Sequence, residues 1–475
     1  MKLTLGRIAG LLGAGGEFGA DALVSGYSID SRTLARGELF FAVRGESLDG
    51  HDFVLDALQK GAAGAVVRQD QRPRFPDAAA LLTVGDPLAA LQTLGREVRT
   101  LWGKPLVAVT GSTGKTTTKE IIARLLATRY RVLKSEGNLN NHFGLPLQLL
   151  RLEEEHGIAV VELGMSHAGE ITALTKLARP SLGAVTNVAP VHLGFFASLA
   201  EIAAAKRELI DHLGPDAVAV LNADDEYVGQ FGRNFPGRII SFGLGEAAEV
   251  RAEDMEERGL LGSKFTLAAG GERRSVTLPL LGRHNIYNAL AAVAVALQYG
   301  IAPAVLAAEL GKLDAIDKRG QILTIGGATV VNDCYNSNPR ALDCMVDALC
   351  GMSAASGKRR IVVAGEMLEL GVTGEDLHRR CGRRMAEQGI DMLVGVRGLA
   401  KFMVEGARQG SGPAGSSRTR AEFLESPERA GEWLAREVQP GDVVLLKASR
   451  GVRLERALQL WRAKLDEIKQ VSEKG

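Results

Sequence analysis

The chain has 475 residues, 46% of them hydrophobic, with 57 glycines and a formal net charge of +1 at pH 7. This length exceeds what one core organises, so we expect about two to four domains of a soluble α/β protein. The near-zero charge and the lack of a basic block argue against nucleic acid as a partner, and the longest apolar run, residues 289–297, is too short to span a membrane.

The N-terminus and the cysteines indicate the compartment. Arg7 interrupts the first residues before an apolar signal-peptide core can form. Cys334, Cys344, Cys350 and Cys381 have neither the spacing of a metal site nor the density of a disulfide framework, so we interpret them as reduced thiols. We therefore expect a cytoplasmic protein.

Residues 1–82 form the first expected unit of the chain. Short strands are predicted at residues 38–43 and 64–67, and helices at residues 54–58 and near the N-terminus. A linking helix is predicted over residues 86–102.

The second expected unit, residues 83–312, alternates apolar strands with helices, which is typical of a parallel sheet covered on both faces. Its strands are predicted at residues 106–110, 158–163, 183–187 and 217–222. A more antiparallel stretch is predicted at residues 238–281, followed by helices at residues 285–298 and 303–310.

The third expected unit, residues 313–475, again alternates strands with helices, which predicts a second doubly wound sheet. Its strands are predicted at residues 329–333, 361–364, 392–396 and 443–447, and a surface loop at residues 410–417. The fold class is therefore α/β with three domains.

A glycine-rich turn follows the first strand of the second unit and leads into a helix predicted at residues 120–128. Backbone N–H groups of such a turn wrap polyphosphate oxygens, a lysine adds charge, and a threonine hydroxyl can hold Mg²⁺. The residues expected to act in this way are Gly111, Ser112, Thr113, Gly114, Lys115, Thr116 and Thr117. The full Walker pattern has glycine where this chain has Val109, so the loop is a shortened P-loop. An ordinary turn with a surface lysine is the alternative, and we predict ATP binding.

Two further side chains are expected at the same edge of the sheet, because ligands gather at the carboxyl ends of parallel strands. Glu162 ends one predicted strand and could hold Mg²⁺ directly or through water. The alternative is a solvated acid at a strand end. His192 follows the next predicted strand, and the alternative for it is a packed or surface histidine.

Lys206 is singled out by helical spacing. Ser198 and Glu201 have the spacing of a capping box, which predicts a helix over residues 198–213. Lys206 falls within the apolar stripe of that helix, and an inward-facing lysine tends to lose its proton. A neutral amine near two metal ions could take up CO₂ as a carbamate, which is a metal-binding anion. The alternative is that Lys206 extends from the edge of the stripe to solvent.

Three polar residues are candidates for nucleotide contacts. Asn285 is predicted as the N-cap of the helix over residues 285–298, and Asn288 lies one turn later, where it could contact a purine edge. Asp333 ends a strand of the third unit and could bind a ribose hydroxyl. Turn formation by the Asn and Pro residues that follow it is the alternative.

Five segments together resemble the Mur ligases, the ATP-dependent amide-forming enzymes of peptidoglycan precursor synthesis, over essentially the whole chain. The segments are residues 137–146, 282–288, 333–339, 365–371 and 447–450. They are similar to the branch that joins D-alanyl-D-alanine to UDP-N-acetylmuramoyl-tripeptide. Two departures are Ala448, where that branch has glycine, and Glu366, where it has aspartate. The run Asn338-Pro339-Arg340 is similar to a signature of the branch that adds a diamino acid, and we interpret this as coincidence.

The resemblance implies the role of each domain and its site residues. Residues 1–82 would bind the UDP end of the substrate, residues 83–312 would form the ATPase domain, and residues 313–475 a Rossmann-like domain that admits the dipeptide. The implied catalytic residues are Lys115, His192 and Lys206. One Mg²⁺ would bind Thr116 and Glu162, and a second would bind His192 and carbamylated Lys206. Asn285 and Asn288 would lie near the adenine, Arg319 near the phosphates and Asp333 on the ribose. The implied substrate contacts are Ser31 and Arg32 for uridine, Asn138 and Asn141 for the peptide, and Tyr335, Asn336, Lys447, Ser449 and Arg450 for the dipeptide.

The implied reaction passes through an acyl phosphate and yields the UDP-N-acetylmuramoyl-pentapeptide, and we expect the enzyme to be a monomer. The nearest alternatives are the branch that adds lysine or diaminopimelate and a folylpolyglutamate synthase. Both alternatives are disfavoured by the segments at residues 137–141 and 447–450. A nucleotide-gated binding protein is the alternative from another class, but it would not need Glu162, His192 and an inward Lys206 together.

Overall fold

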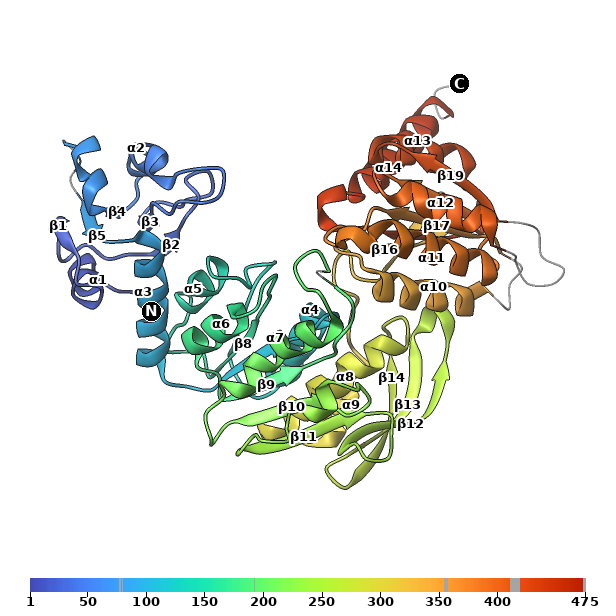
Figure 1. The fold of residues 1–475 in the computed structure, drawn as a ribbon, viewed down its shortest axis with the longest axis horizontal. Helices are drawn as coiled ribbons and strands as arrows, with labels where there is room; N and C mark the ends of the chain where they lie inside the picture. Colours follow the sequence, from blue (N-terminus) through green and yellow to red (C-terminus); the bar gives the residue numbers. More distant parts are fainter. Residues whose placement is uncertain (77, 79, 192, 354–357, 411–418, 473–475) are drawn as a thin grey trace.

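Three β-sheets, one for each expected unit, organise the chain in a computed structural model (Figure 1). The structure describes residues 1–76, 78, 80–191, 193–353, 358–410 and 419–472. We call the parts built on these sheets the first, central and third units. The predicted three-part α/β architecture is confirmed.

The first unit is a five-stranded sheet in the order β1-β5-β4-β3-β2, parallel except for β1. Its strands are β1 (Gly15–Glu17), β2 (Gly26–Ser28), β3 (Glu38–Phe41), β4 (Gly64–Arg68) and β5 (Leu81–Val84). Two helices, α1 (Leu5–Leu12) and α2 (Val54–Gln59), belong to this unit. The strands and the helix predicted near residues 38, 54 and 64 are thus present.

The central unit is a nine-stranded sheet in the order β14-β13-β12-β11-β10-β9-β6-β8-β7. Its strands are β6 (Leu106–Thr110), β7 (Val132–Lys134), β8 (Ile158–Glu162), β9 (Leu182–Val185), β10 (Val218–Asn222), β11 (Arg238–Gly243), β12 (Val250–Glu257), β13 (Ser263–Ala269) and β14 (Glu272–Leu278). Every residue of β6, β8, β9 and β10 is buried, as the apolar runs predicted.

The antiparallel character predicted for residues 238–281 is confirmed for β12–β14 and wrong for β11, which pairs in parallel with both β10 and β12. The connection between β10 and β11, residues 223–237, is long enough for the crossover that parallel strands need. The connection between β13 and β14 consists of Gly270 and Gly271, both with positive φ, which suits a tight hairpin.

The third unit is a six-stranded sheet in the order β15-β16-β20-β17-β18-β19, with only β15 antiparallel among these described strands. Its strands are β15 (Gln321–Ile325), β16 (Ala328–Asp333), β17 (Arg360–Gly365), β18 (Met392–Val396), β19 (Arg420–Leu424) and β20 (Val443–Lys447). Its helices are α10 (Pro339–Ser353), α11 (Gly374–Glu387), α12 (Ala400–Gln409), α13 (Pro427–Glu437) and α14 (Glu455–Ser472). The four predicted strands are present, and the loop predicted at residues 410–417 lies outside the described residues except for Gly410.

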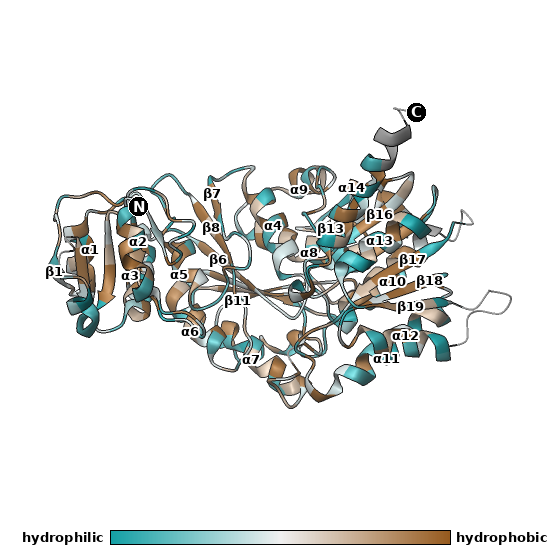
Figure 2. Cartoon of the chain, turned by 90° about the horizontal axis from the view of Figure 1, so that it is seen from above, coloured by the Kyte–Doolittle hydropathy of each residue, from teal (hydrophilic) through white to brown (hydrophobic). Residues whose placement is uncertain are grey.

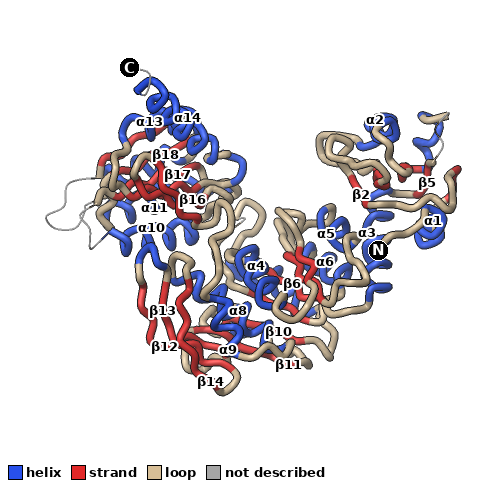
Figure 3. Tube along the Cα trace, turned by 180° about the vertical axis from the view of Figure 1, so that it is seen from behind, coloured by secondary structure: helices blue, strands red, loops and turns tan. Residues whose placement is uncertain are grey.

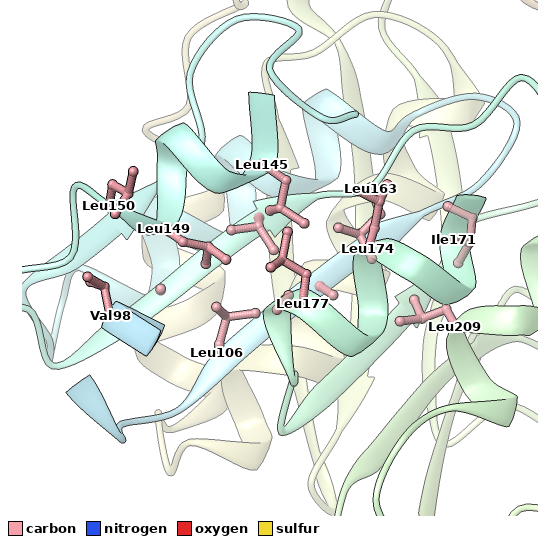
Figure 4. Close-up of a cluster of buried hydrophobic side chains, with 14 of the residues drawn as sticks. Val98, Leu106, Leu145, Leu149, Leu150, Leu163, Ile171, Leu174, Leu177 and Leu209 are labelled. Carbon is pink, nitrogen blue, oxygen red and sulfur yellow. The ribbon is translucent and has the colours of Figure 1, made fainter. Parts of the chain in front are cut away.

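The first and central units share one hydrophobic core. Helix α3 (Pro87–Trp102) lies between them and packs against α1 on one side and against α5 (Gly144–Leu149) and α6 (Glu170–Ala178) on the other (Figures 1 and 3). Figure 4 shows Val98 of α3 with Leu106, Leu149 and Leu174 in this core. The cluster continues without a break to Leu39 in the first sheet, so these two units form one body.

The third unit has apolar clusters of its own on the two faces of its sheet. Figure 2 shows that the strands are mainly hydrophobic and that hydrophilic residues lie on the helices around them. Among the described residues, no helix is both long and apolar enough to cross a bilayer.

Helices at the edge of the central sheet differ from their predicted limits. Helix α4 (Lys115–Leu126) begins five residues earlier than predicted, because Gly114 adopts a φ of 80° and starts it directly from the loop. Helix α8 (Arg283–Gln298) has Gly282 at its N-cap, so the prediction of Asn285 as the cap is wrong. The amide of Asn285 instead donates to the Leu281 carbonyl at 2.8 Å.

The two other predicted helices of this edge are confirmed. Helix α7 (Leu199–Asp211) is capped by Ser198, whose hydroxyl accepts from the Glu201 backbone N–H. Helix α9 spans Pro303–Leu310, as predicted. The capping prediction therefore places Lys206 in the middle of α7.

Candidate active site

A cavity of about 1140 Å³ opens at the carboxyl ends of β6 and β8 and faces the third unit. Residues from all three units line it, including Glu46 from the first, Lys115 and Glu162 from the central, and Tyr335 and Lys447 from the third. A volume of this size holds a nucleotide together with a second substrate.

The phosphate loop has the conformation that bound polyphosphate needs. Gly111 and Gly114 have φ values of 146° and 80°. A Cβ atom would lie 1.9 Å from the Thr186 hydroxyl at the first position and 2.3 Å from the Asn288 amide oxygen at the second. Glycine is thus required at both positions for close packing as well as for backbone conformation.

Lys115 folds back over this loop, and its ammonium donates to the Gly111 carbonyl at 2.9 Å. Burial lowers the pKa of Lys115, the Glu162 carboxylate opposes this shift, and Arg319 adds to it. The ammonium therefore gains most from an additional anion placed in the cavity.

Asn187, which was not predicted from the sequence, holds the phosphate loop through hydrogen bonds to Ser112 and Thr113. Its side-chain oxygen accepts from the backbone N–H and the hydroxyl of Thr113 at 3.1 and 3.0 Å, and its carbonyl accepts from the Ser112 N–H at 2.9 Å. The Thr186 hydroxyl donates to the Thr113 carbonyl at 2.6 Å. These bonds fix the loop before any ligand binds.

Thr116 and Glu162 meet at the start of α4. The Thr116 hydroxyl donates to Glu162 Oε2 at 2.6 Å and accepts from the Arg319 guanidinium at 2.9 Å. Glu162 is 5% exposed, so its charge is shielded from water. A carboxylate and a hydroxyl at this spacing are hard oxygen ligands of the kind Mg²⁺ takes together with water and phosphate oxygens, and the pair fits that ion.

Asn140 orients this carboxylate and Ser135 fixes the Glu162 backbone, and neither residue was predicted. The Asn140 amide donates to Glu162 Oε1 at 2.8 Å, and the Ser135 hydroxyl accepts from the Glu162 backbone N–H at 3.1 Å. Asn138 and Asn141, which were predicted, also line the cavity, and the side-chain oxygen of Asn141 accepts from the Gly144 N–H at 2.9 Å.

Lys206 faces inward, as its place in the apolar stripe predicts. It is 2% exposed, so the alternative of a lysine extending to solvent is wrong. Burial and the nearby charge of Lys115 lower the pKa of Lys206 well below its ordinary value. Among the described residues no carboxylate forms an ion pair with it, and His192, its predicted neighbour in a metal site, lies outside the described residues.

The predicted nucleotide residues lie together at the start of α8 and at the boundary with the third unit. Asn288 accepts from the Thr118 hydroxyl at 3.2 Å and donates to Asn285 at 2.9 Å. The Arg319 guanidinium lies 4.2 Å from the centre of the Tyr335 ring. Asn285, Asn288 and Arg319 all line the cavity.

The predicted dipeptide residues surround the carboxyl end of β20. The Lys447 ammonium pairs with the Asp333 carboxylate and donates to the Asn336 carbonyl at 3.1 Å. Ser449 accepts from the Leu368 N–H at 3.0 Å. These residues line the cavity together with Arg450, whose guanidinium pairs with Glu455 at 2.6 Å.

His284, which was not predicted, lies between the central and third units. Burial lowers its pKa to about 4, with the Asp333 carboxylate opposing the shift. Its Nδ1 has no hydrogen-bond partner in the described part of the chain. Its position directly before Asn285 was the available signal in the sequence.

Ser31 and Arg32 lie in the first unit, outside the wall of the cavity formed by described residues. The Ser31 carbonyl accepts from Lys60 at 2.9 Å, and Arg32 pairs with Asp30 at 2.7 Å. That pairing lowers the pKa of Asp30 to about 2. The first unit reaches the cavity through Glu46.

Comparison with known proteins places the whole chain in one family. Three family models match it: the Mur ligase catalytic domain at residues 23–96, the Mur ligase middle domain at residues 109–296, and the Mur ligase glutamate ligase domain at residues 318–450. A curated relative from Bacillus subtilis is 34% identical, with 91% of this chain and 92% of the relative aligned. The chain belongs to the Mur ligase family.

The relatives of this Mur ligase agree in name. The Bacillus subtilis protein is a UDP-N-acetylmuramoyl-tripeptide--D-alanyl-D-alanine ligase, as is an Escherichia coli protein that is 35% identical over 83% of this chain and 86% of its own length. The structure of MurF from Acinetobacter baumannii is 29% identical with a TM-score of 0.85 and covers 97% of this chain and 98% of its own. MurF from Thermotoga maritima in complex with ADP is 28% identical with a TM-score of 0.79 over 93% and 98%.

Proposed function

We propose that this Mur ligase joins D-alanyl-D-alanine to UDP-N-acetylmuramoyl-tripeptide with the consumption of ATP, yielding the UDP-N-acetylmuramoyl-pentapeptide of peptidoglycan synthesis. The named relatives support the reaction. The single observation that carries it in this chain is the shared cavity, in which the phosphate loop and Glu162 face Lys447 and Tyr335 of the third unit. One cavity can thus hold the triphosphate, the acyl group and the incoming amine.

The first step is transfer of the γ-phosphoryl group of ATP to the terminal carboxylate of the tripeptide. A carboxylate oxygen forms a bond to phosphorus, the bond to the β,γ-bridging oxygen breaks, and ADP and an acyl phosphate result. The phosphate loop and Lys115 position the triphosphate and neutralise its charge, as phosphoryl transfer requires. Closure of the units over the cavity would exclude water, which hydrolyses an acyl phosphate.

The second step forms the amide bond. The neutral amine of D-alanyl-D-alanine attacks the acyl carbon and forms a carbon–nitrogen bond. The carbon–oxygen bond to phosphate then breaks. The nitrogen loses one of its two protons to water and keeps the other in the amide. We assign Tyr335, Asn336, Lys447, Ser449 and Arg450 to the dipeptide. Their placement at the carboxyl ends of the paired strands β16 and β20, in the same cavity as the phosphate loop, supports this assignment.

ATP and Mg²⁺ are the cofactors. Bound Mg²⁺ neutralises phosphate charge, and we assign Thr116 and Glu162 to the first ion because their oxygens converge. We assign the ATP contacts to residues 111–117 and to Asn285, Asn288, Arg319 and Asp333.

A second Mg²⁺ on His192 and carbamylated Lys206 completes the proposed metal site. The burial of Lys206 and its lowered pKa support the carbamate, because a neutral amine can attack CO₂. The nitrogen forms a bond to carbon, one C=O electron pair moves to oxygen, and a proton is released to water. Labelling with ¹³C-bicarbonate would give a carbamate NMR signal that is lost in Lys206→Ala.

The remaining assignments concern the substrate and the whole chain. We assign Ser31 and Arg32 to the uridine nucleotide and Asn138 and Asn141 to the peptide. We place the domain boundaries near residues 82 and 312: the first falls within β5, the last strand of the first sheet along the chain, and the second follows α9. We propose a cytoplasmic monomer, and the four free cysteines agree with a reducing compartment.

An assay of ADP and phosphate release across a panel of acceptors tests the function. We expect release only when UDP-N-acetylmuramoyl-tripeptide and D-alanyl-D-alanine are both present, with the pentapeptide detected by mass spectrometry. Tripeptides ending in lysine and in diaminopimelate form two arms, and the dipeptide nucleotide with free diamino acid forms a third. Turnover in the third arm alone would overturn the proposal in favour of the neighbouring branch. Nucleotide binding without release in every arm would favour a switch protein.

A further inference from the structure

The third unit contacts the central unit at a segment next to the phosphate loop. The Arg340 guanidinium donates to the Val188 carbonyl at 3.2 Å, and the Gly194 N–H donates to the Glu369 carbonyl at 3.1 Å. A Cβ atom at Gly371 would lie 2.9 Å from the Gly194 Cα, so the backbones are in close contact here. The third unit thus contacts two positions, Val188 and Gly194, within the connection between β9 and α7.

Val188 is also fixed from within the central unit. Its N–H donates to the Asp225 carboxylate at 2.9 Å, and the same carboxylate accepts from the N–H of Val228 at 3.0 Å. The peptide groups on the two sides of Val188 are therefore held by Asp225 and by Arg340, one from each unit. A movement of Arg340 is transmitted to a backbone that has little freedom to absorb it.

The neighbours of Val188 are bonded directly to the phosphate loop. The Asn187 carbonyl accepts from the Ser112 N–H at 2.9 Å, and the Ala189 N–H donates to the Ser112 hydroxyl at 2.8 Å. That hydroxyl donates in turn to the Ala189 carbonyl at 3.1 Å. The residues bonded to the loop are therefore the two covalent neighbours of Val188, whose carbonyl accepts from Arg340.

Arg340 itself belongs to the dipeptide side of the cavity. It is the second residue of α10, and the segment that precedes this helix contains Tyr335 and Asn336. The Asn336 carbonyl accepts from Lys447, and all four side chains line the cavity. A ligand that rearranges this segment acts on Arg340 through a few residues of backbone.

We propose that Arg340 is a positioning residue that couples occupation of the dipeptide site to the conformation of the phosphate loop. The inference rests on the proposed function, because it takes D-alanyl-D-alanine as the ligand of the third unit. In this role Arg340 acts through its hydrogen bond to Val188, and not as a ligand of the nucleotide or the dipeptide. Binding of either ligand then raises the affinity for the other by the same factor, as linkage requires.

The test measures this factor by calorimetry on the full chain. A non-hydrolysable ATP analogue with Mg²⁺ is titrated in the presence of UDP-N-acetylmuramoyl-tripeptide, with and without saturating D-alanyl-D-alanine. We expect the dipeptide to tighten analogue binding by a factor on the order of 5 to 150 in the parent chain. In Arg340→Ala the factor falls to within about twofold of one, while each ligand alone keeps its affinity.

Two further variants separate coupling from folding and from direct contact. Arg340→Lys keeps one donor for the Val188 carbonyl and restores part of the factor. Arg383→Ala removes an exposed arginine of α11 outside the cavity wall and leaves the factor unchanged. Equal melting temperatures establish that the variants are folded.

Three outcomes would overturn the proposal. One is an unchanged factor in Arg340→Ala, and another is a factor of one in the parent chain. The third is a dipeptide affinity that falls equally with and without the analogue, which would make Arg340 a dipeptide ligand. Failure of the proposed function is distinguishable by titrating D-alanyl-D-alanine itself into the parent chain with UDP-N-acetylmuramoyl-tripeptide present, because the dipeptide would then show no binding, whereas a factor of one with a bound dipeptide overturns the coupling alone.

Discussion

Replacement of Thr116 by valine tests the assignment of the Mg²⁺ site. Valine keeps the shape of the side chain and removes the hydroxyl that donates to Glu162 at 2.6 Å and accepts from Arg319 at 2.9 Å. A hydrogen bond to a charged group contributes about 1.5–3 kcal/mol. We use the same range for the lost interaction of this oxygen with Mg²⁺.

That energy corresponds to a loss of affinity of about 10- to 150-fold for Mg²⁺ in the nucleotide complex. Stability should change less, because Arg319 and Glu162 can pair directly once the hydroxyl is absent. The assay is a titration of Mg²⁺ against enzyme and a fluorescent ATP analogue, with melting temperatures measured in parallel. This readout does not depend on turnover.

Thr172→Val is the matched control. The Thr172 hydroxyl also donates to a glutamate, Glu208, at 3.1 Å, but it lies on α6 outside the cavity wall. We expect its Mg²⁺ titration to match that of the parent chain. An unchanged Mg²⁺ midpoint in folded Thr116→Val would refute the assignment of Thr116 and Glu162.

Three further predictions concern single residues. Lys206→Ala should abolish turnover, and bicarbonate should not restore it, because no amine remains to form the carbamate; near-normal steady-state rates would contradict this role. Asn140→Leu removes the donor to Glu162 Oε1 and should raise the Mg²⁺ midpoint about 10-fold or more, as loss of an outer-shell partner does, whereas an unchanged midpoint would count against this positioning role. Folding lowers the pKa of His284 from 6.5 to about 4, so the unfolded chain binds this proton first as the pH falls. The stabilisation by neutral His284, at most about 3 kcal/mol, is complete above pH 6.5 and is lost toward pH 4, and urea unfolding of His284→Asn should lack this slope.

Local sequence patterns predicted the long buried strands and the inward face of Lys206, because each depends on residues close together in the chain, but they did not predict strands such as β7 and β15. The apolar run of residues 106–110 became β6 without change, and the capping pair Ser198 and Glu201 placed α7 correctly. Helical spacing was then enough to predict that the Lys206 side chain is buried. A short pattern carries this information because strand and helix periods repeat within a few residues.

Contacts between distant segments were not predictable in the same way. Asn140 reaches Glu162 across 22 positions, and Asn187 reaches Thr113 across 74. Such pairs exist only after strands far apart in the chain have become neighbours in the sheet. The same holds for Arg340 and Val188, which belong to different units.

The continuous core around α3 has a consequence for substrate length. Because Leu39 and Leu106 belong to one packed cluster, the proposed uridine site and the phosphate loop stand at a fixed separation. A precursor bound at its nucleotide end must therefore be long enough for its terminal carboxylate to reach the phosphate loop. Each missing amino acid shortens its reach by about 3.3–3.6 Å, which leaves the terminal carboxylate short of the triphosphate. If Ser31 and Arg32 hold the uridine as proposed, we expect this fixed separation to reject shorter precursors without a pocket that contacts the absent residue.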